Sequence, residues 1–180
     1  IRTSYAKEVG LRILIGAAVR MVARYDSALK PVFSYNKRHY FRLFLQAERG
    51  MKNADEMLKN MAYLQHCFKC DWRSYVKVDR FIDKCPNCGN QLDWAGPLWA
   101  GEFADPKFCD KIKSDNPKVM QLVNTIKNEQ VIQTPFYDLH HLAEIYHVSA
   151  PKQIPLLEKY NALPTHFCKT GMRCEEVPKF

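Results

Sequence analysis

Four cysteines arranged as two pairs constrain the fold of this chain more than any other feature of its sequence. Two residues separate the members of each pair and fourteen separate the pairs, which are Cys67, Cys70, Cys85 and Cys88. Four thiolates complete the tetrahedral shell that Zn²⁺ prefers in closed structural sites, and this spacing is close to that of a zinc ribbon. Gly89 follows the second pair and permits the left-handed backbone of a tight metal-binding turn. We therefore predict a structural zinc site.

Disulfide or redox roles are the alternatives for these cysteines. The chain has seven cysteines, so they cannot all pair, and neither Cys-x-x-Cys pair lies beside a βαβ pattern. A site closed by four sulfurs leaves no position for water, so the metal should hold structure. We expect Cys109, Cys168 and Cys174 to be buried or idle thiols, and His66 to be a bystander rather than a ligand.

The composition indicates a globular protein with an affinity for polyanions. Hydrophobic residues make up 47% of the chain, and no apolar run is long enough to span a membrane. No signal peptide is visible, and the free-thiol usage favours the cytoplasm. The net charge of +8 and the pI near 9.1 make nucleic acid the leading candidate partner. A basic chain without such a partner is the other interpretation.

The first 50 residues are expected to close a larger α/β domain. The pattern predicts a helix from Ser4 to about Asp26, with Ser4 as its N-cap. Strands should follow at 30–35 and 39–47, with both faces of the second strand covered. The expected apolar face of the helix comprises Val9, Ile13, Leu14, Ala17, Ala18, Met21 and Val22, and a basic stripe comprises Arg12, Gly16, Arg20 and Arg24.

Residues 51–60 are polar and are predicted to be a linker with at most a short helix. A zinc-ribbon module should then occupy residues 61–104, with strands at 62–66 and 74–79. An ordered loop with two tryptophans is expected at 94–101.

Residues 105–180 are expected to be a helical, winged-helix-like region. The second helix of its helix-turn-helix should be capped by Ser149 and shortened or kinked at Pro155, and a hairpin should turn at Thr170 and Gly171. The predicted helices span 106–114, 117–130, 138–146 and 149–160. The fold class is thus α/β (α+β): the closing part of a larger α/β domain, a zinc ribbon and a winged-helix-like tail.

Five collinear stretches carry a resemblance to a known family. The chain resembles the tRNA (guanine-26-N2)-dimethyltransferase family, which has a similar Glu-Val-Gly-x-Arg-Ile-Leu helix and a Gly-Pro-x-Trp-x-Gly motif. The four-cysteine cluster also occurs in many members. The matching stretches span nearly the whole chain and lie at 2–16, 39–44, 96–101, 136–138 and 165–167.

The resemblance implies a class I methyltransferase that moves methyl groups from S-adenosylmethionine to the exocyclic amine of a guanine in tRNA. Residues 1–50 would then be the last helix and strands of the class I methyltransferase sheet. In the family, the S-adenosylmethionine loop and an Asp-Pro-Phe-Gly catalytic motif lie upstream, and no such motif occurs between Ile1 and Phe180. We therefore assign no catalytic and no cofactor-binding residue here. We expect this chain to continue an N-terminal methyltransferase domain, to serve tRNA binding and structure, and to be inactive alone.

Six basic residues are candidate contacts to tRNA phosphates: Arg20, Arg24, Lys37, Arg38, Lys169 and Arg173. Family members commonly have Ser/Thr-Arg-Thr-His where this chain has Leu-Pro-Thr-His at 163–166. The motif around Arg173 therefore has two interpretations. It either contacts RNA or is structural, with His166 capping the wing.

Two other functions compete with the methyltransferase interpretation. One is a non-enzymatic adaptor that binds nucleic acid through its zinc ribbon and winged helix. The other is a structural zinc module that mediates oligomerisation. No arrangement of residues typical of a catalytic site occurs in the sequence, since the adjacent His140 and His141 cannot face one point from a helix.

Overall fold

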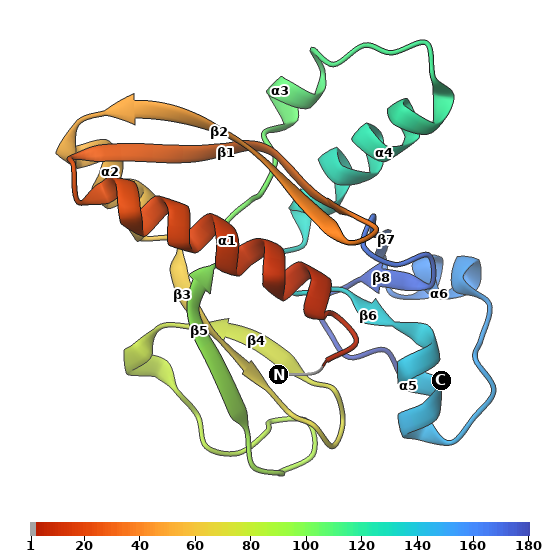
Figure 1. Ribbon diagram of the computed structural model, residues 1–180. Coiled ribbons are helices and arrows are strands. Elements are labelled where there is room, and N and C mark those ends of the chain that lie inside the picture. Colours follow the sequence, from red (N-terminus) through yellow and green to blue (C-terminus); the bar gives the residue numbers. More distant parts are fainter. Residues whose placement is uncertain (1–2) are drawn as a thin grey trace.

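The computed structural model describes residues 3–180, and a single central helix organises them (Figure 1). This helix, α1 (Ala6–Ala23), lies between an antiparallel hairpin on one side and a three-stranded sheet on the other. The hairpin consists of β1 (Ser27–Lys37) and β2 (Tyr40–Arg49). No helix in the described part of the chain is long and apolar enough to cross a membrane.

The predicted α1 exists, but it buries a different face from the one expected. Its fully buried residues are Glu8, Leu11, Arg12, Ile15, Gly16 and Val19, whereas Ile13, Leu14 and Met21 are exposed. Apolar residues nearly surround this helix, so periodicity alone could not select the inward face. Gly16 selects it in part, because a β-carbon there would lie 3.1 Å from the backbone nitrogen of Trp99. Tyr5, rather than Ser4, occupies the N-cap position.

The β1–β2 hairpin confirms the two predicted strands but not the covering of both faces of β2. Phe41, Leu43 and Leu45 are half-buried, while Tyr40 and Phe44 on the opposite face are exposed. Strand β1 is more buried than β2, and the 103–105 segment pairs with its other edge. There, the Ser34 N–H donates to the Phe103 carbonyl at 2.9 Å. Strand β2 has no such neighbour among residues 3–180.

Residues 51–60 are not a bare linker. They form α2 (Met51–Leu58), whose Ala54 is buried and which packs on β1 and α1. The second sheet follows, with β3 (Met61–His66) between β4 (Arg73–Val76) and β5 (Asp93–Trp99). The short 3-10 helix η1 (Val78–Arg80) follows β4. The loop expected at 94–101 is largely strand β5, and Pro97 is accommodated because β5 is an edge strand with a bulge in its pairing to β3.

The C-terminal region begins with α3 (Pro106–Cys109), which is shorter than predicted, and α4 (Pro117–Asn128), which continues into η2 (Glu129–Val131). Asp105 and Asn116 cap the two α-helices through their side chains, each followed by proline at the first helical position.

The tail then forms two helices and a small antiparallel sheet. The elements are β6 (Tyr137–Asp138), α5 (Leu139–Tyr146), α6 (Gln153–Lys159), β7 (Leu163–Pro164) and β8 (Gly171–Arg173), and the strand order is β6-β8-β7. Lys152 takes the N-cap position expected for Ser149. Pro155 therefore lies in the first turn of α6, where its missing N–H leaves no hydrogen bond unmade.

One main hydrophobic core joins residues from Tyr5 to Phe167. It crosses the predicted boundaries near residues 50, 60 and 104, so the division of the chain into four parts stays a prediction. A second cluster lies in the tail around Tyr137, Leu142 and Met172. A third cluster consists of Leu92 and three of the four paired cysteines. Trp72 packs against both smaller clusters.

Candidate functional site

The four paired cysteines converge on one point at the end of the β4-β3-β5 sheet. Their Sγ atoms all lie within 4.8 Å of one another, and Cys67, Cys70 and Cys85 are buried. The Sγ atoms of Cys67 and Cys88 are 3.5 Å apart, and those of Cys70 and Cys85 are 3.6 Å apart. Sulfurs placed tetrahedrally around Zn²⁺ at about 2.3 Å would be separated by about 3.8 Å. The donor set and its spacing therefore fit zinc.

Two hydrogen-bonded turns hold these thiols in place. The Asp71 N–H donates to the Cys67 carbonyl at 2.9 Å, and the Gly89 N–H donates to the Cys85 carbonyl at 2.8 Å. Asp71 and Gly89 both have positive φ, 62° and 71°, so each pair is closed by a left-handed residue. The prediction for Gly89 is confirmed, and Asp71 takes the same conformation after the first pair.

Burial and backbone amides set the thiol chemistry. Burial raises the pKa of Cys70 to about 12, whereas a hydrogen bond from the Asn90 backbone lowers the pKa of Cys88 to about 7. Buried neutral thiols gathered this closely gain most from a cation that replaces their protons. Four protein ligands leave no open coordination position, so a metal held here would cross-link two turns rather than activate a substrate.

The remaining cysteines and His66 lie outside this group. All seven cysteines are free thiols, with Cys109 and Cys174 buried and Cys168 half-buried. His66 is buried beside the site, and burial lowers its pKa to about 3. Its neutral ring packs edge-on against Phe68 with 4.4 Å between the ring centres, which agrees with a residue that does not bind the metal.

A buried ion pair connects the first cysteine turn to the tail. Asp71, next to Cys70, pairs with Arg73, whose guanidinium carbon lies 3.8 Å from the Tyr5 ring centre and 4.2 Å from that of Tyr137. The Arg73 Nη1 also donates to the Phe136 carbonyl at 3.1 Å. The first cysteine turn, the N-cap of α1 and β6 are therefore held together by one buried arginine.

Five of the six candidate RNA contacts are exposed, at three places on the surface, and the sixth is buried. Arg20 and Arg24 are exposed at the C-terminal end of α1. Lys37 and Arg38 are exposed at the turn of the β1–β2 hairpin, which lies near the N-terminal end of α1 (Figure 1). Lys169 is exposed on the segment between β7 and β8. Arg173 is fully buried.

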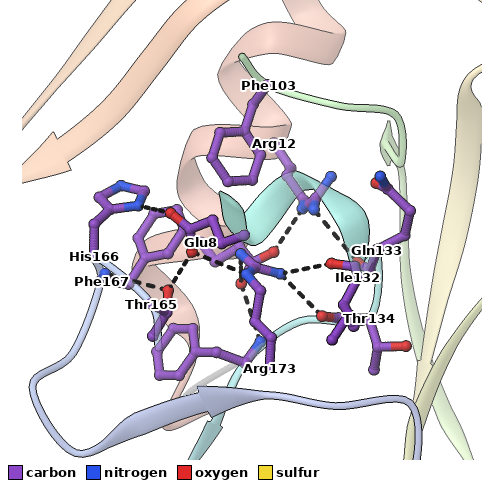
Figure 2. A network of polar contacts seen from close by, with 12 residues as sticks. Glu8, Arg12, Phe103, Ile132, Gln133, Thr134, Thr165, His166, Phe167 and Arg173 are labelled. Atoms are coloured by element: carbon purple, nitrogen blue, oxygen red, sulfur yellow. Dashed lines mark hydrogen bonds and ion pairs between the residues drawn. The ribbon is translucent and has the colours of Figure 1, made fainter. Parts of the chain in front are cut away.

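Arg173 belongs to an internal network of charges, and the RNA contact expected of it is therefore wrong. Its Nε lies 2.9 Å from Glu129 Oε2, and its Nη2 lies 2.9 Å from Glu8 Oε2. Its Nη1 donates to the Thr134 carbonyl at 2.9 Å (Figure 2). These carboxylates raise the pKa of Arg173 further despite its burial, so the guanidinium stays charged and has no surface left for a phosphate.

The same network contains a second arginine from the basic stripe predicted on α1. Arg12 pairs with Glu8 at 2.9 Å, one turn earlier on the helix (Figure 2). It also donates to the carbonyls of Trp99 and Gly101. Two glutamates and two arginines thus balance their charges without access to water. Sequence inspection missed Glu8 and Glu129 as partners, although the spacing of Glu8 and Arg12 is a visible signal for an ion pair within a helix.

His166 joins this network to the hairpin. Its Nδ1 contacts Glu129 Oε1, and the Asn36 backbone N–H donates to its Nε2 at 3.3 Å. The acceptor role of Nε2 assigns the ring proton to Nδ1. Thr165, which also donates to Glu129, and the side chain of His166 are both buried, which favours the structural interpretation of this motif. The result is that the hairpin turn and the segment carrying Lys169 are attached to one anchor.

Comparison with known proteins places these features among tRNA methyltransferases. The family described as N2,N2-dimethylguanosine tRNA methyltransferase matches residues 1–178. The tRNA (guanine(26)-N(2)/guanine(27)-N(2))-dimethyltransferase of Aquifex aeolicus is 36% identical over 99% of the chain and 49% of its own length. The tRNA (guanine(26)-N(2))-dimethyltransferase of Methanobrevibacter smithii is 35% identical over 96% of the chain and 48% of its own length.

A solved structure agrees with this relationship. Trm1 from Pyrococcus horikoshii, in a complex with S-adenosyl-L-methionine, superposes with a TM-score of 0.77 at 26% identity. The match covers 98% of this chain and 48% of that one. The chain therefore spans about half the length of the relatives that it matches.

Proposed function

This chain belongs to the N2,N2-dimethylguanosine tRNA methyltransferase family, and from that premise we propose that it is the tRNA-holding and structural part of an enzyme that methylates N2 of guanine-26 in tRNA. S-adenosylmethionine would supply the methyl groups. We place its binding site and the catalytic residues in the part of the protein outside residues 1–180, because no Asp-Pro-Phe-Gly motif occurs in this chain. By itself, the chain should transfer no methyl group.

The observation that carries the proposal is the meeting of basic residues from two distant segments at one anchor. Lys37 and Arg38 directly follow Asn36 in the sequence, Lys169 lies three residues after His166, and the Asn36 backbone N–H donates to His166. All three cations are exposed, and the chain carries a net charge of +8. Cations held in a fixed arrangement on a basic protein are suited to phosphates of a folded RNA. Arg20 and Arg24 would make a separate contact at the other end of α1.

The supporting framework has two parts. We interpret the β4-β3-β5 sheet with its four cysteines as a zinc ribbon, in which zinc fixes the turns that carry Asp71 and Arg73. We interpret the order α4, β6, α5, α6, β7, β8 as a winged helix, with Lys169 in its wing. Both would keep the tRNA backbone in register while the guanine is exposed for methyl transfer elsewhere in the protein. The cytoplasm, where tRNA is processed and thiols stay reduced, is the expected location.

Charge reversal tests the holding role. Lys37→Glu, Arg38→Glu and Lys169→Glu together should weaken tRNA binding and reduce the dependence of affinity on salt, because each lost phosphate contact lowers the salt slope by about one. The matched control reverses the same number of charges, at Lys111, Lys113 and Lys118, which are exposed at the connection between α3 and α4 and at the start of α4. This control should reduce affinity much less than the variant at Lys37, Arg38 and Lys169. Unchanged tRNA affinity of that variant at low salt would contradict the proposal.

A methylation assay separates the enzyme from the adaptor. Incubation with radiolabelled S-adenosylmethionine and tRNA should label guanine-26 when the full-length protein is used and leave it unlabelled with the 180-residue chain alone. A full-length protein that binds tRNA without labelling it would support the adaptor instead.

A further inference from the structure

We propose that metal occupancy of the four-cysteine site controls the order of α5 and of the tail segment that carries Lys169, through a chain of buried contacts that begins at Asp71. The proposal rests on the function proposed above, because it makes the holding of tRNA depend on bound metal. The cysteines themselves fit zinc. The new element is the route by which the tail responds to the presence of the metal.

Asp71 belongs both to the metal site and to the contacts with the tail. Its N–H closes the first cysteine turn on the Cys67 carbonyl at 2.9 Å, and its φ of 62° is a conformation that a non-glycine residue keeps only when its surroundings hold it. Its buried carboxylate pairs with the guanidinium of Arg73. Metal bound to Cys67 and Cys70 would fix this turn and, with it, the position of the carboxylate.

Arg73 extends the route to the tail. Its guanidinium lies between the rings of Tyr5 and Tyr137, and its Nη1 donates to the Phe136 carbonyl at 3.1 Å. In the described part of the chain, Asp71 is the only acidic residue that pairs with this fully buried side chain. A buried charge that loses its partner is strongly destabilised, so displacement of Asp71 would loosen the backbone around Phe136 as well.

The contacts continue from β6 to Lys169. Asp138 caps α5 by accepting the His140 N–H at 3.1 Å, and the Thr170 hydroxyl donates to the same carboxylate oxygen at 2.8 Å. The Leu139 N–H donates to the Thr170 carbonyl at 3.1 Å. Since Lys169 directly precedes Thr170, its backbone position depends on the start of α5.

Helix α5 also reaches the metal site directly. The Nε2 of His141 lies 3.8 Å from Asp71 Oδ1, so one buried carboxylate contacts both β4, through Arg73, and α5. Trp72, the residue between Asp71 and Arg73, packs against the cysteine cluster and against the tail cluster. A loosened first cysteine turn would therefore disturb α5 from two sides.

The other tail contacts have a separate anchor. Arg173 and His166 are held by Glu129 in the buried charge network, which contains neither Asp71 nor a cysteine. The main hydrophobic core likewise contains none of the four paired cysteines. Loss of the metal should therefore loosen α5 and the segment around Lys169, while the β1–β2 hairpin keeps its order.

Amide hydrogen exchange of the full-length protein tests this route without tRNA. Removing zinc with a chelator, checked by elemental analysis, should speed exchange of the α5 amides at least about tenfold and leave the amides of the β1–β2 hairpin unchanged. Equal acceleration in both elements would indicate global unfolding. That result, unchanged exchange in α5, or a purified protein without stoichiometric zinc would each overturn the proposal.

Asp71→Asn interrupts the route at its first step. Asparagine keeps the size of the side chain and tolerates the same left-handed backbone, so the variant should retain zinc. Its α5 amides should exchange at least about tenfold faster than those of the wild type with metal bound, and chelation should add little. Asp83→Asn is the matched control, because Asp83 is exposed beside the second cysteine pair, and it should behave as the wild type. Wild-type exchange in zinc-bound Asp71→Asn would overturn the proposal.

Thr170→Val interrupts the route at its last step and decides the matter if Asp71→Asn loses zinc. It removes the hydroxyl that bonds Asp138 without altering a paired cysteine, so zinc should stay bound. Its tRNA affinity should be lower than that of the wild type and should no longer respond to chelation. A tRNA affinity that falls on chelation as much as in the wild type would overturn the route through Thr170.

Binding of tRNA shows the consequence for the holding role. Chelation should weaken tRNA binding by the wild type about as much as Lys169→Glu does, and should weaken binding by Lys169→Glu little further, because both remove the same contact. Fully additive losses would overturn the link between the metal and Lys169. Failure of the holding function looks different, since Lys169→Glu would then leave tRNA affinity unchanged while the exchange results still held.

Discussion

Replacing Arg173 by methionine should destabilise the protein strongly. Methionine keeps much of the volume but leaves Glu8 and Glu129 facing one another across the site of the lost guanidinium, with Arg12 as the remaining arginine of the network. Breaking a fully buried ion pair from one side costs about 3–5 kcal/mol of unfolding free energy. In a chain of this size that lowers the melting temperature by roughly 10 °C. Thermal and urea unfolding followed by circular dichroism would measure both quantities.

Two further variants make this test specific. Lys169→Met removes an exposed cation from the neighbouring segment and should change stability by less than about 0.5 kcal/mol. Adding Glu129→Gln to Arg173→Met should recover part of the loss, because it removes a buried negative charge that Arg173 had balanced. If Arg173→Met kept the wild-type melting temperature and instead weakened tRNA binding, the structural role assigned to this arginine would be refuted.

Three other perturbations test other parts of the structure. Cys85→Ser should abolish stoichiometric zinc, measured by elemental analysis, and lower the melting temperature, so a variant that kept both would disprove a structural zinc site. Gly16→Ala should lower the free energy of unfolding, measured in urea, by about 1–3 kcal/mol, because the added β-carbon would meet Met61 at 2.8 Å and the Trp99 backbone at 3.1 Å. An unchanged free energy of unfolding would mean that α1 and β5 separate easily. In the folded protein the pKa of Glu129 is lowered from 4.5 to about 2, so the unfolded chain takes up this proton more readily. The ionised carboxylate therefore stabilises the fold fully above pH 4.5, and this contribution is lost as the pH falls toward 2. In Glu129→Gln the free energy of unfolding should therefore depend less on pH between 4.5 and 2. An unchanged pH dependence would contradict the low pKa assigned to Glu129.

Local patterns predicted most elements because their causes are local. The positions of α1, the hairpin strands, β3 and α5 follow from periodicity over a few residues. The helix starts at Asp105 and Asn116 follow from capping and a proline in the first turn. Strand β5 was missed because Gly96 and Pro97 break the strand pattern, and only its pairing with β3 makes a strand there. The inward face of α1 was missed because two layers pack against a helix that is apolar nearly all round.

The sequence by itself determined the cysteine cluster, because each pair is closed by a turn of a few residues and the ligand chemistry is read directly from the side chains. It also determined the basic charge and the family resemblance. Only the tertiary structure decided which basic residues reach the surface. A guanidinium is charged whether it is exposed or buried. The burial of Arg173 depends on carboxylates that α1 and η2 bring to it from distant parts of the chain. The same folding brings Asn36 to His166, and so holds the hairpin turn beside the segment that carries Lys169.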